Sequence, residues 1–209
     1  MICTVTITAN SLDCLIGTNS LNTGQWDAGS PWSNDGCLGG NCLRSHVNMT
    51  ETYYALAMSK KHISMHCAIV TDDILIVTKA KVPANKIFVG ESSYGRSFKM
   101  AKAGCDGPDC FFLGDANNSQ AAKGRCTDTA GYLADAEIEE IIKNNKNAKS
   151  FHDANSGADV LVYNDTEWVG YMTNSTKNLR RNVWKNLNFA GSIDWALDLQ
   201  RFTDADNQA

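Results

Sequence analysis

The placement of cysteine limits the possible folds of this chain more than any other feature of its sequence. Eight cysteines in 209 residues are many for a protein of a reducing compartment. The pairs Cys37/Cys42 and Cys105/Cys110 follow neither C-x-x-C nor C-x-x-C…H-x-x-x-H, so disulfides are favoured over a zinc site. Both pairs lie in Gly-rich stretches, and we expect a long loop over residues 24–50 that Cys37 and Cys42 close.

Other features concern the cell compartment. Four N-x-S/T triplets agree with a secretory route and an extracellular protein. The first residues of the chain lack the basic start of a signal peptide, and Asp13 stands where the apolar region of such a peptide would be. We therefore expect the natural N-terminus to lie upstream of Met1. The triplets begin at Asn48, Asn117, Asn164 and Asn174.

The overall composition excludes several classes of protein. With 43% hydrophobic and 20% charged residues the chain has globular proportions, and its length predicts one large domain or one domain with an insertion. The net charge is -4 and no block of basic residues occurs, so we expect no nucleic-acid partner. No apolar run approaches the roughly 18 residues of a membrane span, so we expect no membrane partner.

Hydrophobic spacing predicts an alternation of strands and helices. A short buried strand begins near Ile87, and its segment, 86–98, ends in small and polar residues, as expected of a strand that leads into a site. A helix is expected over residues 128–144, and another begins after a Thr cap at residue 50. Further on we expect two strands and a Trp-bearing segment within 148–172, an amphipathic helix over 173–187 and a strand over 188–199.

Four blocks of the sequence resemble consecutive blocks in the C-terminal half of fungal secreted chitinases of glycoside hydrolase family 18. They are KIFVGESSYGRSFKMAKAGCDGPDC, KGRCTDTAGYLADAEI, LVYNDTEWVGYM and NFAGSIDWALDLQ. GQWDAGSPW and GNCLRSHVNMTET resemble the preceding segment, so the resemblance covers residues 24–58 and 77–203. It implies an α/β fold, the (β/α)8 TIM barrel, in which YGRSF follows the seventh strand and GSIDWALDL is the eighth.

The resemblance also divides the chain into regions. Residues 59–76 have no counterpart in the family, where a helix like YYALAM runs directly into a segment like VTKAKVPANKIFVG. Their β-branched, hairpin-like pattern conflicts with the helical pattern before it, and we interpret them as translated intron, with a genuine surface insertion as the alternative. The regions are an unmatched segment 1–23, a barrel segment 24–98 with the proposed insert 59–76, an α+β insertion domain 99–172, the last helix and strand of the barrel 173–203, and a tail 204–209.

The length and the acidic residues both argue against a complete catalytic barrel. Subtracting about 70 residues of insertion leaves roughly 140, enough for four or five βα units at about 30 residues each. The resemblance implies an acidic D-x-x-D-x-D-x-E run whose Glu protonates the glycosidic oxygen while the substrate's N-acetyl group acts as the nucleophile. This chain has no such run; Asp135, Glu137 and Glu139 are the nearest imitation, and we expect them on a solvated helix face. The chain therefore has no catalytic residue, and we expect it to be inactive alone.

Four residues match family positions that line the sugar cleft. The resemblance implies that Trp195 forms the floor under the central N-acetylglucosamine, that Tyr94 and Arg96 form hydrogen bonds with the sugar, and that Trp26 forms a wall on the leaving-group side. Flat aromatic faces suit pyranose rings, and a guanidinium suits hydroxyl and carbonyl oxygens. The expected partners are chitin and N-acetylglucosamine oligomers, whose β-1,4 links the full-length relatives hydrolyse with retention and without a cofactor. The aromatic residues Tyr163, Trp168 and Tyr171 are expected to pack within the insertion domain.

Two alternatives to a chitinase fragment stay open. The first is a non-catalytic chitin-binding module that uses the remaining aromatic residues, and the second is a disulfide-rich extracellular protein without a sugar role. Retention on chitin separates them, because the second predicts none. The residues His62, His66 and Cys67 have a spacing that could hold zinc on one helix face, but such a spacing is usually incidental, and we expect no metal.

Overall fold

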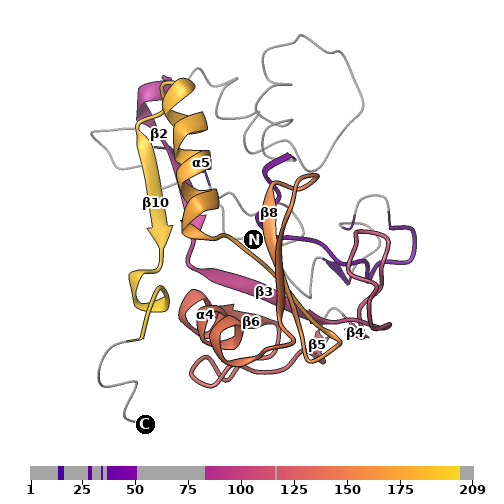
Figure 1. Ribbon diagram of the computed structural model, residues 1–209. Helices are drawn as coiled ribbons and strands as arrows, with labels where there is room; N and C mark the ends of the chain where they lie inside the picture. The colour runs from indigo at the N-terminus through magenta and orange to yellow at the C-terminus, as the bar shows by residue number, and fades with distance from the viewer. Residues whose placement is uncertain are drawn as a thin grey trace.

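In the described part of the chain, the computed structural model contains two larger sheets and one two-stranded sheet, which are drawn with their helices in Figure 1. It describes residues 14–16, 28–29, 34, 37–50, 83–115 and 117–202. The proposed insert 59–76, the tail 204–209 and most of the helix expected after residue 50 lie outside the described residues. None of the described helices is long and apolar enough to cross a membrane.

Three parallel strands form the first sheet, in the order β1-β2-β10. The helix α5 precedes β10 and lies beside it in Figure 1. The side chain of Thr173 caps α5, because its hydroxyl accepts a hydrogen bond from the Thr176 amide at 3.3 Å. The elements are β1 Cys14–Ile16, β2 Ile87–Ser92, β10 Gly191–Trp195, α5 Asn174–Asn186, and the 3-10 helices η1 Ala84–Lys86 before β2 and η2 Leu197–Leu199 after β10.

Five antiparallel strands form the second sheet, in the order β6-β3-β9-β8-β7, and the helix α4 packs against it. Only Ser93 separates β2 from β3, so the chain passes directly from the parallel sheet into the antiparallel one. The elements are β3 Tyr94–Lys99, β6 Tyr132–Ala134, α4 Asp135–Asn144, β7 Lys149–Asp153, β8 Ala158–Tyr163 and β9 Glu167–Tyr171, with a small separate hairpin of β4 Gly114–Asp115 and β5 Asn118–Ser119.

Most of the predicted elements are confirmed, with one correction. The segment 86–98 is extended as predicted: β2 ends at Ser92, and the chain then leaves the parallel sheet and forms β3 in the other sheet. The helix predicted over residues 128–144 begins only at Asp135, because residues 132–134 pair with β3 as β6. The Glu137 carboxylate accepts the Ala134 amide at 2.9 Å, which fixes the helix start at this point.

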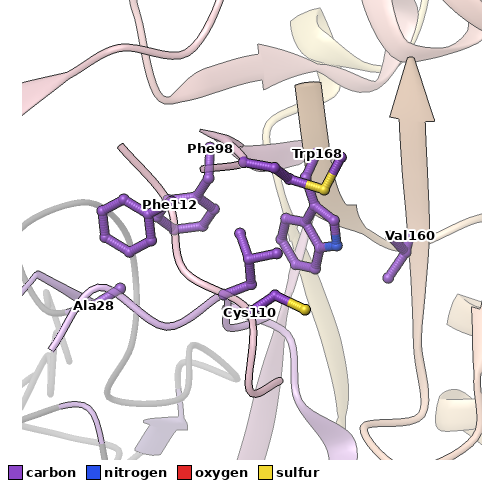
Figure 2. Packing of buried hydrophobic residues seen from close by; sticks show 8 residues of the cluster. Ala28, Phe98, Cys110, Phe112, Val160 and Trp168 are labelled. Carbon is purple, nitrogen blue, oxygen red and sulfur yellow. The ribbon is translucent and has the colours of Figure 1, made fainter. Parts of the chain in front are cut away.

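Trp168 on β9 is the centre of one hydrophobic cluster (Figure 2). Its ring lies 5.8 Å from that of Phe98, which in turn lies 4.7 Å from that of Phe112. The Trp168 indole N–H donates to the Asp106 carbonyl at 3.0 Å, so its polar atom is satisfied. A second cluster under α4 contains Tyr163 and Tyr171. The predicted packing role of these three aromatic residues is therefore confirmed.

Two disulfides each close one of two adjacent loops. The predicted closure of the first loop by Cys37 and Cys42 is confirmed, and Cys105 pairs with Cys110. The loops lie side by side, because the Leu43 amide donates to the Cys110 carbonyl at 2.8 Å. Each bridge thus stabilises a segment that has almost no regular secondary structure of its own.

Candidate functional site

The candidate site lies where the parallel strands β2 and β10 end. Ser92 pairs with Trp195 in the sheet, and the Ser93 amide donates to the Trp195 carbonyl at 2.8 Å. In α/β folds, ligands bind at the carboxyl ends of parallel strands, where loops carry the functional side chains. Tyr94, the first residue of β3, follows directly on Ser93, so β3 begins where β2 ends, beside the end of β10 that carries Trp195.

Trp195 is the exposed aromatic residue of this site. Its exposed fraction is 71%, although it is a strand residue whose backbone is paired with β2. An indole that remains open to solvent on a rigid strand offers a flat apolar face at little entropic cost on binding. The position and exposure of Trp195 are those expected of a surface for a pyranose ring.

Tyr94 and Arg96 belong to a stack of rings and one guanidinium at the start of β3. The Tyr94 ring lies 5.2 Å from the ring of His46 and 4.8 Å from that of Tyr132. The Arg96 guanidinium carbon lies 5.3 Å from the centre of the Tyr94 ring and 5.4 Å from that of Tyr132. Burial, and then the nearby Tyr94, raises the pKa of Tyr132 to about 12, so this phenol is neutral. The cation–π contacts with these two rings hold the Arg96 guanidinium in a fixed position.

His46 is a fully buried member of this stack that sequence analysis did not single out. Burial, followed by the charges of Arg96 and Arg180, holds its pKa well below the ordinary value of 6.5, so the ring is neutral. Its ring nitrogens have no hydrogen-bond partner within the described part of the chain. Arg180 donates to the carbonyls of Val47 and Gly157, which ties the loop that carries His46 to helix α5.

A network of ionic groups surrounds Asp194, the residue that precedes Trp195. The Lys177 ammonium, with a side chain 3% exposed, lies 3.2 Å from Asp194, 3.2 Å from Asp135 and 3.0 Å from the Ser93 hydroxyl. Burial raises the pKa of Asp135 to about 7, and this effect outweighs the opposite effect of Lys177. Asp135 and Lys177 both line a surface cavity of about 580 Å³. None of the predicted sugar-binding residues lines this cavity.

A second ion pair extends this network along β2. Arg181 binds the buried carboxylate of Glu91 with two nitrogens, at 2.6 and 2.9 Å, and its Nη2 lies 3.8 Å from Asp194. The carboxylates of Glu91 and Asp194 thus form ion pairs within the protein. These ion pairs support the strand ends that carry the candidate site.

The prediction that Asp135, Glu137 and Glu139 lie on a solvated helix face is wrong for two of the three. Glu139 is exposed, but Asp135 is mostly buried and the side chain of Glu137 is fully enclosed. Burial favours a higher pKa for Glu137, but hydrogen bonds from Thr127, Ala134 and Cys126 outweigh it and lower the pKa below its ordinary value. Glu137 is therefore a structural anion that holds the loop before α4.

Trp26, the fourth predicted sugar-binding residue, lies outside the described residues, as do His62, His66 and Cys67. Within the described ranges, no group of three His, Cys, Asp or Glu side chains is placed to hold a metal ion. The structure thus brings Tyr94 and Arg96 together and places the Trp195 backbone beside the residue that precedes Tyr94.

Comparison with known proteins identifies the family. The family model for Glycosyl hydrolases family 18 matches residues 43–200. "Probable chitinase LysM18" and "Secreted chitinase LysM12", both of Penicillium expansum, are 48% and 43% identical to this chain over 183 and 184 residues. Each alignment covers 87% of this chain and 11% of the relative, so the chain spans about a ninth of the length of these proteins.

Solved structures agree on the fold. A GH18 chitinase of Cycas revoluta in complex with (GlcNAc)3 aligns with 84% of this chain and 41% of its own, at a TM-score of 0.55 and 18% identity. Human YKL-39, described as a pseudo-chitinase with retained chitooligosaccharide binding properties, aligns with 66% of this chain and 36% of its own, at a TM-score of 0.53 and 25% identity. Together with the match over residues 43–200, these similarities show that the chain has an α/β chitinase fold and belongs to glycosyl hydrolase family 18.

Proposed function

We propose that this chain forms one part of the sugar cleft of a chitin-hydrolysing domain and binds N-acetylglucosamine oligomers weakly without cleaving them. The observation that carries the proposal is the exposed indole of Trp195 at the end of β10, beside the strand end that leads into Tyr94 and Arg96. Rings and a fixed guanidinium at adjoining strand ends provide both a stacking face and hydrogen-bond donors for a sugar.

The proposal assigns the two sheets to the two parts of the family fold. β2 and β10 are the seventh and eighth barrel strands, because they are parallel neighbours and the chain leaves β2 and returns to β10 through residues 93–190. The antiparallel sheet with α4 is the insertion domain, which corresponds to the predicted region 99–172, and α5 with β10 is the closing unit, 173–203. In this arrangement the chain is a partial barrel.

We expect no hydrolysis of the bound sugar because of which acidic residues the chain has and what they bind. The sequence contains no D-x-x-D-x-D-x-E run. The buried carboxylates nearest to the candidate site, those of Glu91, Asp135 and Asp194, are engaged by Arg181 and Lys177. A general acid must reach the leaving oxygen of the bound substrate, and these groups are committed to other partners. We therefore expect the chain to orient a sugar without protonating its leaving oxygen.

A second candidate function is a dedicated chitin-binding module. The similarity to YKL-39 favours it, because that protein is described as a pseudo-chitinase that retains chitooligosaccharide binding. An extracellular location is part of both proposals and agrees with the name of one relative, "Secreted chitinase LysM12". The two candidates differ in the predicted affinity, because a dedicated module has a complete cleft whereas a partial barrel does not.

The test is saturation-transfer NMR with chitohexaose. We expect contacts from the sugar to the chain with a roughly millimolar dissociation constant, and the loss of these contacts in Trp195→Ala. The matched control is Leu179→Ala, which removes an equally exposed apolar side chain from α5 and leaves the signal unchanged. An affinity in the micromolar range would favour the dedicated module, and no contact at all would refute a sugar role.

A further inference from the structure

We propose that Asn164, at the tip of the β8–β9 hairpin, carries an N-linked glycan. The inference rests on the extracellular route in the proposed function but not on sugar binding. Four N-x-S/T triplets occur in the chain, and such a triplet is an acceptor only where the chain remains accessible. The structure distinguishes Asn164 from Asn48 by the surroundings of the asparagine side chain and of the triplet.

The hairpin presents Asn164 to solvent on a firmly held turn. Tyr163 pairs with Glu167, so residues 164–166 form the connection between the strands. Asn164 and Asp165 are exposed and have φ angles of 46° and 63°, a conformation that Asn and Asp tolerate better than most residues. The Thr166 amide donates to the Asn164 carbonyl at 2.7 Å, which closes the turn.

The side-chain amide of Asn164 is oriented so that its nitrogen is available. Its Oδ1 accepts a hydrogen bond from Nδ2 of Asn145, the residue that ends α4, at 3.0 Å. Because the oxygen and nitrogen of an amide point in different directions, this bond turns Nδ2 away from α4. Within the described residues Nδ2 of Asn164 has no hydrogen-bond partner. A glycan on this nitrogen therefore breaks no contact described here.

Asn48 provides the contrast within the same chain. Its side chain is half-buried, and its Oδ1 accepts the Thr50 amide at 3.0 Å. The amide of Met49, the middle residue of that triplet, donates to the Ser156 carbonyl at 2.6 Å, so the whole triplet is held against the β7–β8 turn. A glycan on Asn48 would require this packing to open, whereas one on Asn164 extends into solvent.

The modification is a group transfer from a lipid-linked oligosaccharide diphosphate. Nδ2 of Asn164 forms a bond with the anomeric carbon of the sugar and loses one proton. The bond between that carbon and the diphosphate oxygen breaks, and the lipid diphosphate leaves with the electron pair. The Thr166 hydroxyl is the required third position of the acceptor triplet.

The experiment expresses the full chain behind a cleavable secretory leader in yeast and recovers it from both the medium and the microsomal membranes. Peptides are treated with a peptide-N-glycosidase in heavy-oxygen water and analysed by mass spectrometry. Thr166→Ala and Thr166→Ser form the matched pair, because both keep the backbone bonds of residue 166 but only the Ser variant keeps the acceptor triplet. Asn164→Asp is a further control that tolerates the same φ angle.

We expect heavy-oxygen aspartate at position 164 but not at position 48, and the loss of one glycan in Thr166→Ala and Asn164→Asp but not in Thr166→Ser. Unmodified Asn164 in either fraction overturns the inference, as does a Thr166→Ala protein with the same number of glycans as the wild type. Failure of the chain to bind chitohexaose would refute the proposed function and leave this result unchanged.

Discussion

The ammonium of Lys177 lies 3.2 Å from the carboxylate of Asp194, the residue that immediately precedes Trp195. This buried pair joins helix α5 to the end of β10, and the Ser93 hydroxyl completes it by donating to Asp194. Breaking a buried ion pair by removing one partner typically costs about 3–5 kcal/mol, because the other charge is left uncompensated.

Lys177→Met should therefore lower the free energy of unfolding by about 3–5 kcal/mol in urea titrations. The variant leaves the partly buried Asp194 with only the more distant Arg181 as a cation among the described residues, so adding Asp194→Asn should recover part of the loss. Lys185→Met is the control, because Lys185 is exposed on the same helix and surface substitutions usually change stability by less than about 0.5 kcal/mol. Equal effects of Lys177→Met and Lys185→Met would show that the pair has no structural role.

Asp135 should make the protein less stable as the pH rises. Its pKa in the folded state is about 7, above the ordinary value of 3.8, so the folded state holds the proton where the unfolded state has lost it. The stability from this group is fully present below about pH 4 and is lost as the pH rises through 7, at about 1.4 kcal/mol for each unit of pKa difference. Urea titrations at pH 5 and pH 8 should show this decline in the wild type and in Glu139→Gln, but not in Asp135→Asn. A decline of the same size in Asp135→Asn would contradict the assignment.

Glu137 should make the protein less stable as the pH falls. Its pKa is lowered, so its contribution is present above the ordinary value of 4.5 and is lost as the pH falls through the lower pKa of the folded state. Glu137→Gln should cost about 1.5–3 kcal/mol at pH 7, the usual value of a hydrogen bond to a charged group, and much less at pH 3. Glu139→Gln, at an exposed position of the same helix, is the control. Differential scanning fluorimetry across this pH range tests both variants, and a cost that does not depend on pH would argue against a buried anion.

The Cys105–Cys110 bridge should stabilise the protein by about 2 kcal/mol, as expected for a loop this short. The double variant Cys105→Ser/Cys110→Ser measures this contribution in urea titrations under oxidising conditions. Cys126→Ser is the control, because Cys126 is exposed and forms no disulfide with a described residue. If the control lost as much stability as the double variant, the Cys105–Cys110 bridge would not be the cause.

Several strands and helices could be predicted from the sequence. The spacing of apolar residues correctly predicts α5, β10 and the run β7 to β9. The start of α4 could not be predicted, because residues 132–134 have apolar spacing that fits a helix as well as a strand. Pairing of Tyr132 with Arg96 decides between them, and this is a contact between residues distant in sequence.

Only some of the residues around the candidate site could be predicted from the sequence. Tyr94, Arg96 and Trp195 could be proposed from short motifs, but Lys177 and His46 could not. A lysine or glutamate on an amphipathic helix normally faces solvent, and burial becomes favourable only when acceptors or donors from other elements meet it. Those partners, such as Ser93 for Lys177, lie far away in the chain and have no local signal in the sequence.

The measurement that tests the central claim most directly is the analysis of products after long incubation of the purified full chain with chitohexaose, by chromatography and mass spectrometry. The proposed function gives the chain an aromatic face and a guanidinium for the sugar, and the sequence contains no D-x-x-D-x-D-x-E run, so we expect the hexamer to be recovered intact. Release of shorter oligomers by the wild-type chain, abolished in Trp195→Ala, would contradict this account.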